Sequence, residues 1–200
     1  MSGTAITSLP SSVVHLKNLK RLSLSRCVGL SSNKLTRFSL MQPRRSPNLM
    51  GMLVRSLIGL CSLTQLDLSY CNVQTIPNVL GCLSSLKVLC LRGNNFVCLP
   101  KSIIQLSNLR YLGLGGCTHL RMLPKLPLKI EFIYAPQCTS LETLSLRPEN
   151  DFRPIFDLLN CDKLIENQGY GDLVSTMLRR YFNDAKVCLS VCLSVSLSHM

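Results

Sequence analysis

One spacing of leucines recurs along this chain at a nearly constant interval and constrains its fold more than any other feature. In its clearest copy, Leu86, Leu89 and Leu91 are followed by Asn94. The same spacing begins again at four further positions, of which the last is the weakest: Leu19, Leu63, Leu109 and Ile130. Successive starts are 44, 23, 23 and 21 residues apart, so the chain is built mainly from repeats of about 23 residues.

The spacing predicts how each repeat folds. Residues two apart on a strand share a face, so Leu89 and Leu91 point inward together. Asn94 marks a bend, where its side chain can bond backbone groups left unpaired by the turn. Four copies carry a cysteine at this position: Cys27, Cys71, Cys117 and Cys138. The pattern is the signature of a leucine-rich repeat. It predicts an α/β solenoid with a curved parallel sheet on the concave side and short helices or 3-10 turns on the convex side.

Three connecting segments support the predicted convex side. Residues 9–16, 76–83 and 99–106 each begin with an aliphatic residue and a proline, and an apolar residue follows three positions after the proline. Proline suits the first position of a short helical turn, because the N–H that it lacks would have had no partner there. One repeat buries too little apolar surface to fold alone, so stability must come from stacked neighbours.

The repeats are predicted to occupy residues 1–146, with about five to six copies. Because residues 1–10 match the middle of a repeat, the solenoid is expected to be truncated at both ends. Residues 28–62 hold either one degenerate repeat or an insertion rich in Arg and Lys. Residues 147–186 are expected to form an incomplete segment that caps the last repeat, with a strand near residues 152–160 and a short amphipathic helix. Residues 187–200 are a low-complexity tail.

Charge is distributed unevenly along the chain. Residues 1–130 contain 16 Lys and Arg but one acid, Asp67, whereas residues 131–200 contain 6 basic and 9 acidic residues. A basic surface of this kind can bind nucleic acid, an anionic membrane or an acidic protein, or it can simply be a solvated convex face. Phe38 is the one aromatic residue in the basic insertion, which argues against nucleic acid. The sequence contains no run of about 18 apolar residues, so it predicts no membrane span.

The eleven cysteines indicate free thiols rather than a disulfide framework. Their number is odd, and the chain begins without a signal-peptide pattern and contains no Asn-x-Ser/Thr sequon, so we expect a reducing compartment. We expect no catalytic activity, no cofactor and no metal site. The three histidines lie in no nucleophile motif, and cysteines spaced by about one repeat belong to the core rather than to a metal site.

The predicted functional surface is the concave face, where residues beside the inward leucines project outward. We expect a protein partner there, with no small-molecule substrate, because aromatic and Arg side chains are typical anchors of protein interfaces. An alternative for Phe132 and Tyr134 is that they pack beneath the C-terminal cap. The candidate binding residues are Arg21, Arg26, Gln65, Asp67, Tyr70, Val88, Arg92, Tyr111, Phe132 and Tyr134.

Several phrases resemble one family of plant proteins. They include Gly93-Asn-Asn-Phe96, Leu123-Pro-Lys-Leu-Pro127 and Cys138-Thr-Ser-Leu141-Glu-Thr-Leu144. They resemble the repeats of disease-resistance receptors with a Toll/interleukin-receptor domain and a nucleotide-binding domain (TIR-NB-LRR), and residues 160–181 resemble the start of the domain that follows those repeats. The chain contains no phosphate-binding loop, so nucleotide binding is not implied.

The resemblance implies a recognition and autoregulatory module in plant defence. Its partners would be a pathogen effector or a guarded host protein, and the acidic nucleotide-binding domain of the full-length receptor. It also implies a cytoplasmic location, with the nucleus as an alternative. The competing interpretation is a truncated, structural or decoy repeat protein without a signalling function of its own.

Overall fold

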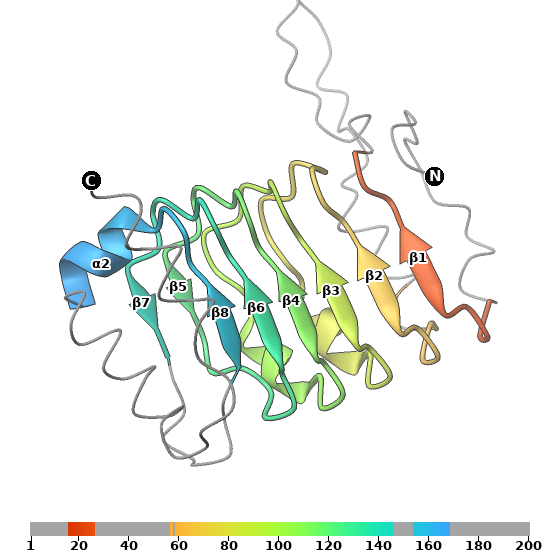
Figure 1. Cartoon of the computed structure of the whole chain (residues 1–200). Helices are drawn as coiled ribbons and strands as arrows, with labels where there is room; N and C mark the ends of the chain where they lie inside the picture. Colours follow the sequence, from red (N-terminus) through yellow and green to blue (C-terminus); the bar gives the residue numbers. More distant parts are fainter. Residues whose placement is uncertain (1–15, 27–56, 58, 146–153, 169–200) are drawn as a thin grey trace, which may run out of the picture.

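A computed structural model describes residues 16–26, 57, 59–145 and 154–168. Its main element is a parallel sheet of six short strands in the spatial order β1-β2-β3-β4-β6-β8 (Figure 1). The strands are Arg21–Ser23 (β1), Gln65–Asp67 (β2), Val88–Cys90 (β3), Tyr111–Gly113 (β4), Phe132–Tyr134 (β6) and Ile155–Asp157 (β8). The predicted parallel sheet of a leucine-rich-repeat solenoid is therefore confirmed.

The strands pair in the register of the repeat. The central residue of each strand lies opposite the central residue of the next, which places the inward side chains in one row: Leu22, Leu66, Leu89, Leu112, Ile133 and Phe156. A slip by one residue would turn every one of these side chains toward water. The hydrophobic pattern therefore fixes which face of the sheet is concave and exposed.

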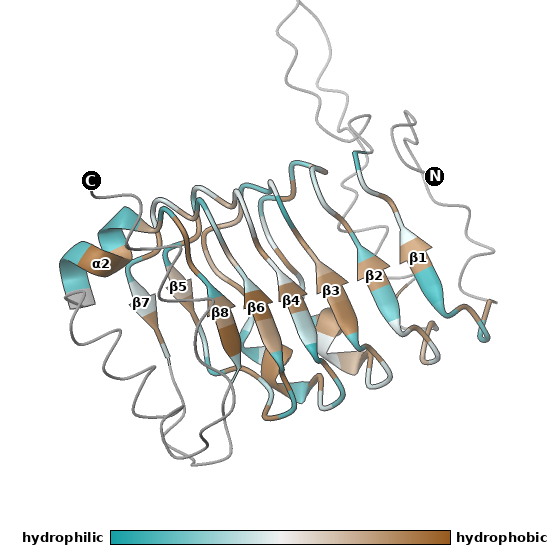
Figure 2. Cartoon of the chain, in the orientation of Figure 1, coloured by the Kyte–Doolittle hydropathy of each residue, from teal (hydrophilic) through white to brown (hydrophobic). Residues whose placement is uncertain are grey.

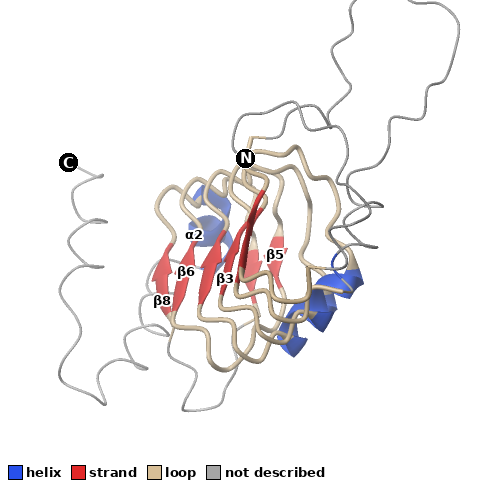
Figure 3. Cartoon of the chain, turned by 90° about the vertical axis from the view of Figure 1, so that its right-hand side faces the viewer, coloured by secondary structure: helices blue, strands red, loops and turns tan. Residues whose placement is uncertain are grey.

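Two 3-10 helices form the side of the coil opposite the sheet (Figure 3). They are Asn78–Cys82 (η3), which follows Pro77, and Lys101–Gln105 (η4), which follows Pro100. The two prolines have φ angles of −75° and −67°, which are the values that the proline ring favours. The prediction that proline begins the convex turns is confirmed for both described segments.

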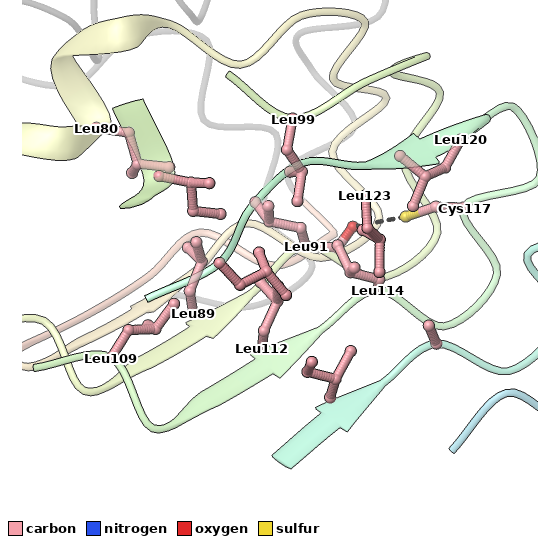
Figure 4. Close-up of a cluster of buried hydrophobic side chains, with 14 of the residues drawn as sticks. Leu80, Leu89, Leu91, Leu99, Leu109, Leu112, Leu114, Cys117, Leu120 and Leu123 are labelled. Carbon is pink, nitrogen blue, oxygen red and sulfur yellow. Dashed lines mark hydrogen bonds between the residues drawn. The ribbon is translucent and has the colours of Figure 1, made fainter. Parts of the chain in front are cut away.

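The core is a continuous stack of aliphatic side chains inside the coil. Leu89, Leu91, Leu112 and Leu114 are each fully buried, and Figure 4 shows them packed together with neighbours from the convex turns. Burying a Leu side chain contributes roughly 1.5–3 kcal/mol. Because each coil packs on the next, this contribution is shared between neighbouring repeats.

A ladder of side-chain hydrogen bonds joins successive coils at the bend. Each ladder residue donates to a backbone carbonyl of the preceding coil. Cys117 Sγ, for example, lies 3.2 Å from the carbonyl oxygen of Leu91 (Figure 4). The ladder bonds are Cys71 to Leu24 (2.9 Å), Asn94 to Leu68 (2.9 Å), Cys117 to Leu91 (3.2 Å), Cys138 to Leu114 (3.3 Å) and Cys161 to Ala135 (3.1 Å). The predicted bend role is thus observed, except that Cys27 lies outside the described residues.

A second, two-stranded sheet lies at the last coils. It consists of Met122–Leu123 (β5) and Thr143–Leu144 (β7), which pair in parallel, and Cys98 forms a bridge to Met122. Leu123 of β5 is followed by Pro124, as Leu99 is by Pro100, whereas Leu144 of β7 is followed by Ser145. The sequence analysis did not predict this sheet.

The C-terminal segment continues the coil beyond the boundary predicted at residue 147. Strand β8 pairs with β6, and Cys161 adds a further rung to the ladder. The helix Asp162–Gln168 (α2) follows and lies beside β7. The strand expected near residues 152–160 is confirmed as β8. Assigning this strand to a cap was wrong for residues 155–161, because Phe156 and Cys161 supply the inward positions of another repeat. The amphipathic helix expected beyond residue 170 and the tail lie outside the described residues.

Strands β1 and β2 are direct neighbours despite their long separation in sequence. Leu22 pairs with Leu66, and the Leu24 amide donates to the Asp67 carbonyl at 2.8 Å. A degenerate repeat stacked between them is therefore ruled out, and the alternative of an insertion at residues 28–62 is retained. Most of that segment, with its basic residues, lies outside the described residues, as do residues 1–15.

Candidate protein-binding surface

The concave face is built from alternate residues of the six strands. The first outward row is formed by Arg21, Gln65, Val88, Tyr111, Phe132 and Ile155. The second row is formed by Ser23, Asp67, Cys90, Gly113, Tyr134 and Asp157. Strands β1 and β2 are mostly hydrophilic, whereas β3, β6 and β8 are mostly hydrophobic (Figure 2). The face therefore changes from polar to aromatic along the sheet.

Four predicted residues meet in one cluster on this face. Arg92 donates a hydrogen bond from Nη2 to the hydroxyl oxygen of Tyr111, and its Cζ lies 4.4 Å from the ring centroid of Tyr134. The rings of Tyr111 and Phe132 are stacked, with centroids 5.8 Å apart and planes 8° apart. We call Arg92, Tyr111, Phe132 and Tyr134 the Arg-aromatic cluster. Cation–π and stacking contacts fix all four side chains relative to one another.

Two glycines of the intervening coil make room for the cluster. A Cβ at Gly113 would lie 3.3 Å from Arg92 Nε, and a Cβ at Gly115 would lie 2.7 Å from Tyr134 Cε1. Arg92 can therefore reach Tyr134 across β4. Sequence reasoning missed this role. The available signal was a pair of glycines at alternate positions after Tyr111, in the coil before Phe132 and Tyr134.

Two further predicted residues form a separate pair at the rim. The Cζ of Arg26 lies 5.7 Å from the ring centroid of Tyr70, and a Cβ at Gly93 would lie 2.3 Å from Tyr70 Cδ1. Tyr70 is 51% exposed. Both residues have left-handed backbones, with φ of 58°. They therefore belong to the turn after the strand and not to the sheet itself.

The remaining four predicted residues lie on β1, β2 and β3 and do not join the cluster. Both carboxylate oxygens of Asp67 already accept hydrogen bonds. Oδ1 accepts from the Ser69 amide at 2.9 Å, and Oδ2 accepts from the Ser23 hydroxyl on β1 at 3.4 Å. Gln65 and Val88 are half-buried neighbours in register, and Arg21 is exposed at the first strand.

Phe132 and Tyr134 are half-buried on the concave face, and the described part of the C-terminal segment does not cover them. Strand β8 extends the sheet beside them, and α2 lies against β7. Strand β8 instead adds three concave positions that sequence reasoning missed: Ile155, Asp157 and Leu159. The spacing of Phe156, Leu158 and Cys161 was the signal that could have revealed them.

Two thiols of the central coils have raised pKa values. Burial, and then the charge of Asp67, raise the pKa of the half-buried Cys90 thiol, whereas Arg92 lowers it. Burial raises the pKa of the Cys117 thiol to about 11. Across the described ranges, no group of three His, Cys, Asp or Glu residues could hold a metal ion. None of the described helices has the length and apolarity needed to cross a membrane.

Comparison with known proteins shows relatives among plant resistance proteins, although no family model matches the chain. Over 169 residues, the chain is 37% identical to Disease resistance-like protein DSC1 of Arabidopsis thaliana, covering 82% of this chain and 12% of that protein. It is 36% identical over 153 residues to TMV resistance protein N of Nicotiana glutinosa, covering 61% and 13%. The chain thus spans about an eighth of the length of these relatives.

The fold comparison agrees with the sequence relatives. The leucine-rich repeat domain of the type III effector XopL superposes with a TM-score of 0.59 at 26% identity, covering 80% of this chain and 51% of that domain. The concave sheet and the ladder of bend residues are therefore those of a leucine-rich repeat, and the sequence relatives specify which kind. Over about four fifths of its length, the chain belongs with the leucine-rich repeats of the plant TIR-NB-LRR disease-resistance proteins.

Proposed function

We propose that this chain is the recognition and autoregulatory module of an intracellular plant immune receptor, and that it senses a pathogen effector or a guarded host protein. The observation that carries the proposal is the Arg-aromatic cluster on the concave face. Tyr and Arg side chains that are held in place before binding lose little entropy on contact, so they are typical interface anchors. The relatives named as disease-resistance proteins supply the immune context.

The same surface supports recognition rather than catalysis. His119 is exposed, and its side chain contacts the Thr118 hydroxyl at 3.3 Å. The ladder thiols are buried and donate to backbone carbonyls. A catalytic thiol needs an accessible, ionised sulfur, and burial opposes ionisation. We therefore assign the ladder cysteines to the core.

Autoregulation would use the basic charge of the N-terminal coils. Residues 1–130 carry 16 basic residues against the single acid Asp67, and exposed examples in the N-terminal coils include Lys20, Arg21 and Lys87. Such a charge distribution favours docking on an acidic domain and weakens as salt increases. We propose the nucleotide-binding domain of the full-length receptor as this second partner, with the complex located in the cytoplasm.

Affinity capture from healthy and infected leaves tests the recognition role. The tagged chain would be compared with the double variant Tyr111→Ala and Phe132→Ala, which removes the stacked rings, and with Lys101→Met on the convex helix η4. We expect one set of proteins to be retained by the chain and by Lys101→Met but lost from the ring variant. At least one of them should be of pathogen origin or change on infection.

Two outcomes would contradict the proposal in different ways. If all three proteins capture the same set, recognition does not use the concave face. If captured proteins are unrelated to infection, the immune role fails even though the surface binds protein. The circular dichroism spectra and thermal midpoints of the variants must match those of the chain, so that loss of capture can be attributed to the changed surface and not to unfolding.

A further inference from the structure

Arg92 is a cation that the fold holds in place without supplying a carboxylate. Its guanidinium is bonded to the neutral hydroxyl of Tyr111 and stacked over Tyr134. Within the described part of the chain, Arg110 and Glu131 form the ion pair, and both of these side chains are exposed; Arg92 takes no part in it. Arg92 is thus positioned by aromatic groups alone.

The guanidinium retains donor capacity in this position. Five N–H groups are available on an Arg side chain, and the contact with Tyr111 uses Nη2. Nε is buried and has no hydrogen-bond acceptor among the described residues, so a partner would approach the Nη groups. A guanidinium fork matches a carboxylate in geometry, and such charge-assisted bonds are about twice as strong as neutral ones.

Neighbouring acidic groups are already engaged elsewhere. Asp67 accepts from its own turn, and Asp157 Oδ1 accepts from the Leu159 amide at 3.3 Å. Burial and the charge of Asp67 raise the pKa of Cys90, so this thiol stays neutral near pH 7 and provides no counter-charge. Among the described residues, then, no carboxylate complements Arg92, and an anion that does so would come from outside this part of the chain.

An apolar strip runs beside this cation. Val88, Tyr111, Phe132 and Ile155 are consecutive in the first concave row, and all four are half-buried. Their register places them on four adjacent strands, which lie about 4.8 Å apart. A partner segment crossing the strands could therefore lay apolar side chains along the strip while a charged neighbour reaches Arg92.

From this arrangement we infer that the concave face takes a protein segment in which an Asp or Glu side chain binds Arg92 and an adjacent apolar side chain packs on Tyr111 and Phe132. The inference rests on the proposed recognition function and names the chemistry of its partner. Nucleic acid fits less well, because a polyanion needs several cations, and the second concave row contains Asp67 and Asp157.

Peptide display provides the test. A random twelve-residue library would be selected on the purified chain, and recovered peptides would be measured by fluorescence polarisation against the chain, Arg92→Met, Arg92→Lys and the control Lys101→Met. We expect peptides enriched in an Asp or Glu next to an aromatic or aliphatic residue. Arg92→Met should weaken their binding about tenfold or more, Arg92→Lys by a few fold, and Lys101→Met by less than about twofold.

A double-mutant cycle makes the assignment specific. Replacing the acidic residue of a recovered peptide by its amide should weaken binding to the chain about tenfold but leave binding to Arg92→Met nearly unchanged, because the pair is then already broken. If the two losses instead multiply, the carboxylate does not bind Arg92 and the inference is overturned. Arg92→Lys covers the case in which Arg92→Met unfolds.

The failure of this inference differs from the failure of the proposed function. Peptides without acidic enrichment that still lose binding to a Phe132→Ala variant would leave the recognition surface in place and overturn the carboxylate partner. Peptides that bind all variants equally, or a selection that recovers no binder, would count against both.

Discussion

Asn94 bonds more backbone groups than any single thiol of the ladder. Its Nδ2 donates to the carbonyls of Leu68 and Leu91 at 2.9 and 2.7 Å, and its Oδ1 accepts from the amides of Cys71 and Val73 at 3.2 and 2.9 Å. A buried polar group that loses its partner costs about 1–3 kcal/mol. Asn94→Ala should therefore lower the free energy of unfolding by about 3 kcal/mol or more, as measured by urea denaturation.

The matched control for Asn94→Ala is Asn94→Cys. A thiol at this position can still donate to the Leu68 carbonyl, as the other ladder cysteines do to theirs, so the loss should be clearly smaller. Equal losses for the two variants would show that the ladder donor contributes nothing and that the amide oxygen of Asn94 carries the effect.

The position just before each ladder residue has a left-handed backbone in all six described coils. The φ angles there are 58° at Arg26 and Tyr70, 60° at Gly93 and Gln137, 73° at Gly116 and 58° at Asn160. Side chains with a Cβ lose roughly 1–2 kcal/mol in this region, whereas glycine does not. Gln137 is exposed and has no described side-chain bond, so only its backbone is at issue.

Gln137→Gly should therefore stabilise the chain by about 1 kcal/mol, because the strain it removes exceeds the extra entropy of an unfolded glycine. Thr139→Gly, two residues away at an exposed site without positive φ, should destabilise by about 0.5 kcal/mol. Thermal unfolding would rank the three proteins. A stabilisation by both glycines, or by neither, would contradict the role assigned to the left-handed turn.

Buried thiols make the stability of this chain sensitive to alkaline pH. Burial raises the pKa of Cys117 from 9.0 to about 11, so the unfolded chain releases this proton first as the pH rises. The unfolded state then binds fewer protons than the folded state, and the free energy of unfolding must fall with pH. The contribution is fully present below about pH 9 and is lost between pH 9 and 11.

The variant Cys117→Ser isolates this effect because its hydroxyl does not titrate in the range. The difference in unfolding free energy between the chain and Cys117→Ser should shrink by up to about 2 kcal/mol between pH 9 and pH 11. Cys82→Ser, which replaces an exposed thiol in the same way, is the control for the substitution itself. A constant difference for Cys117→Ser would mean that this thiol has an ordinary pKa.

At the scale of the elements, the convex helices pack closely because Gly81 has no side chain. A Cβ at this position would lie 2.7 Å from the backbone carbonyl oxygen of Ser102 in η4. Backbone cannot yield as a side-chain tip can, so Gly81→Ala should push η3 from η4 and destabilise by about 1–3 kcal/mol. Ser84→Ala, exposed just after η3, is the control and should be nearly neutral. Urea denaturation with equal midpoints for both variants would contradict the close packing.

Elements with a strict leucine spacing could be predicted from the sequence, and the prediction of the other features was incomplete for identifiable reasons. The strand that became β8 was predicted near residues 152–160, but it was assigned to a cap and not to a repeat, because Phe156 replaces the leucine and a polar stretch precedes it. Gly93 and Gly116 indicate a left-handed turn in the sequence, whereas Arg26, Tyr70 and Gln137 adopt the same conformation without a sequence signal for it. Pairing of β1 with β2 across an insertion depends on tertiary stacking, which no local pattern encodes.

The concave face, too, could be predicted only in part. Alternation along the strands predicted that Arg92, Tyr111, Phe132 and Tyr134 share one face, and they do. The contact of Arg92 with Tyr134 depends on side-chain conformations and on the space above Gly113 and Gly115, which spacing alone does not determine. Tyr70 was expected on the sheet, but the turn places it at the rim.

At the scale of the whole molecule, the solenoid is a stack in which each coil contacts its neighbours. Stability in such a stack is approximately a sum over coils and nearest-neighbour interfaces, so a coil at the edge of the stack opens more easily than one inside it. In the described sheet, β1 forms one edge and β3 lies inside (Figure 1). The strands differ little in length or local hydrogen bonding, so position should dominate.

Two amides allow a matched measurement by hydrogen exchange. The Leu24 amide donates to the Asp67 carbonyl and the Leu91 amide to the Gly113 carbonyl, both at 2.8 Å, and both side chains are buried. Because local bonding and burial are equal, stacking position is the main difference. We expect Leu24 to exchange at least about tenfold faster than Leu91 under native conditions, equivalent to about 1.4 kcal/mol.

The variant Leu112→Ala separates this stacking model from global unfolding. It removes a fully buried side chain on β4, next to β3, and should cost about 2–5 kcal/mol. Exchange at Leu91 should then accelerate strongly, while exchange at Leu24 should change little because that amide already opens locally. If both amides accelerate by the same factor, the chain opens as one cooperative unit, and the concave face on β3, β4 and β6 does not unfold separately from the first coil.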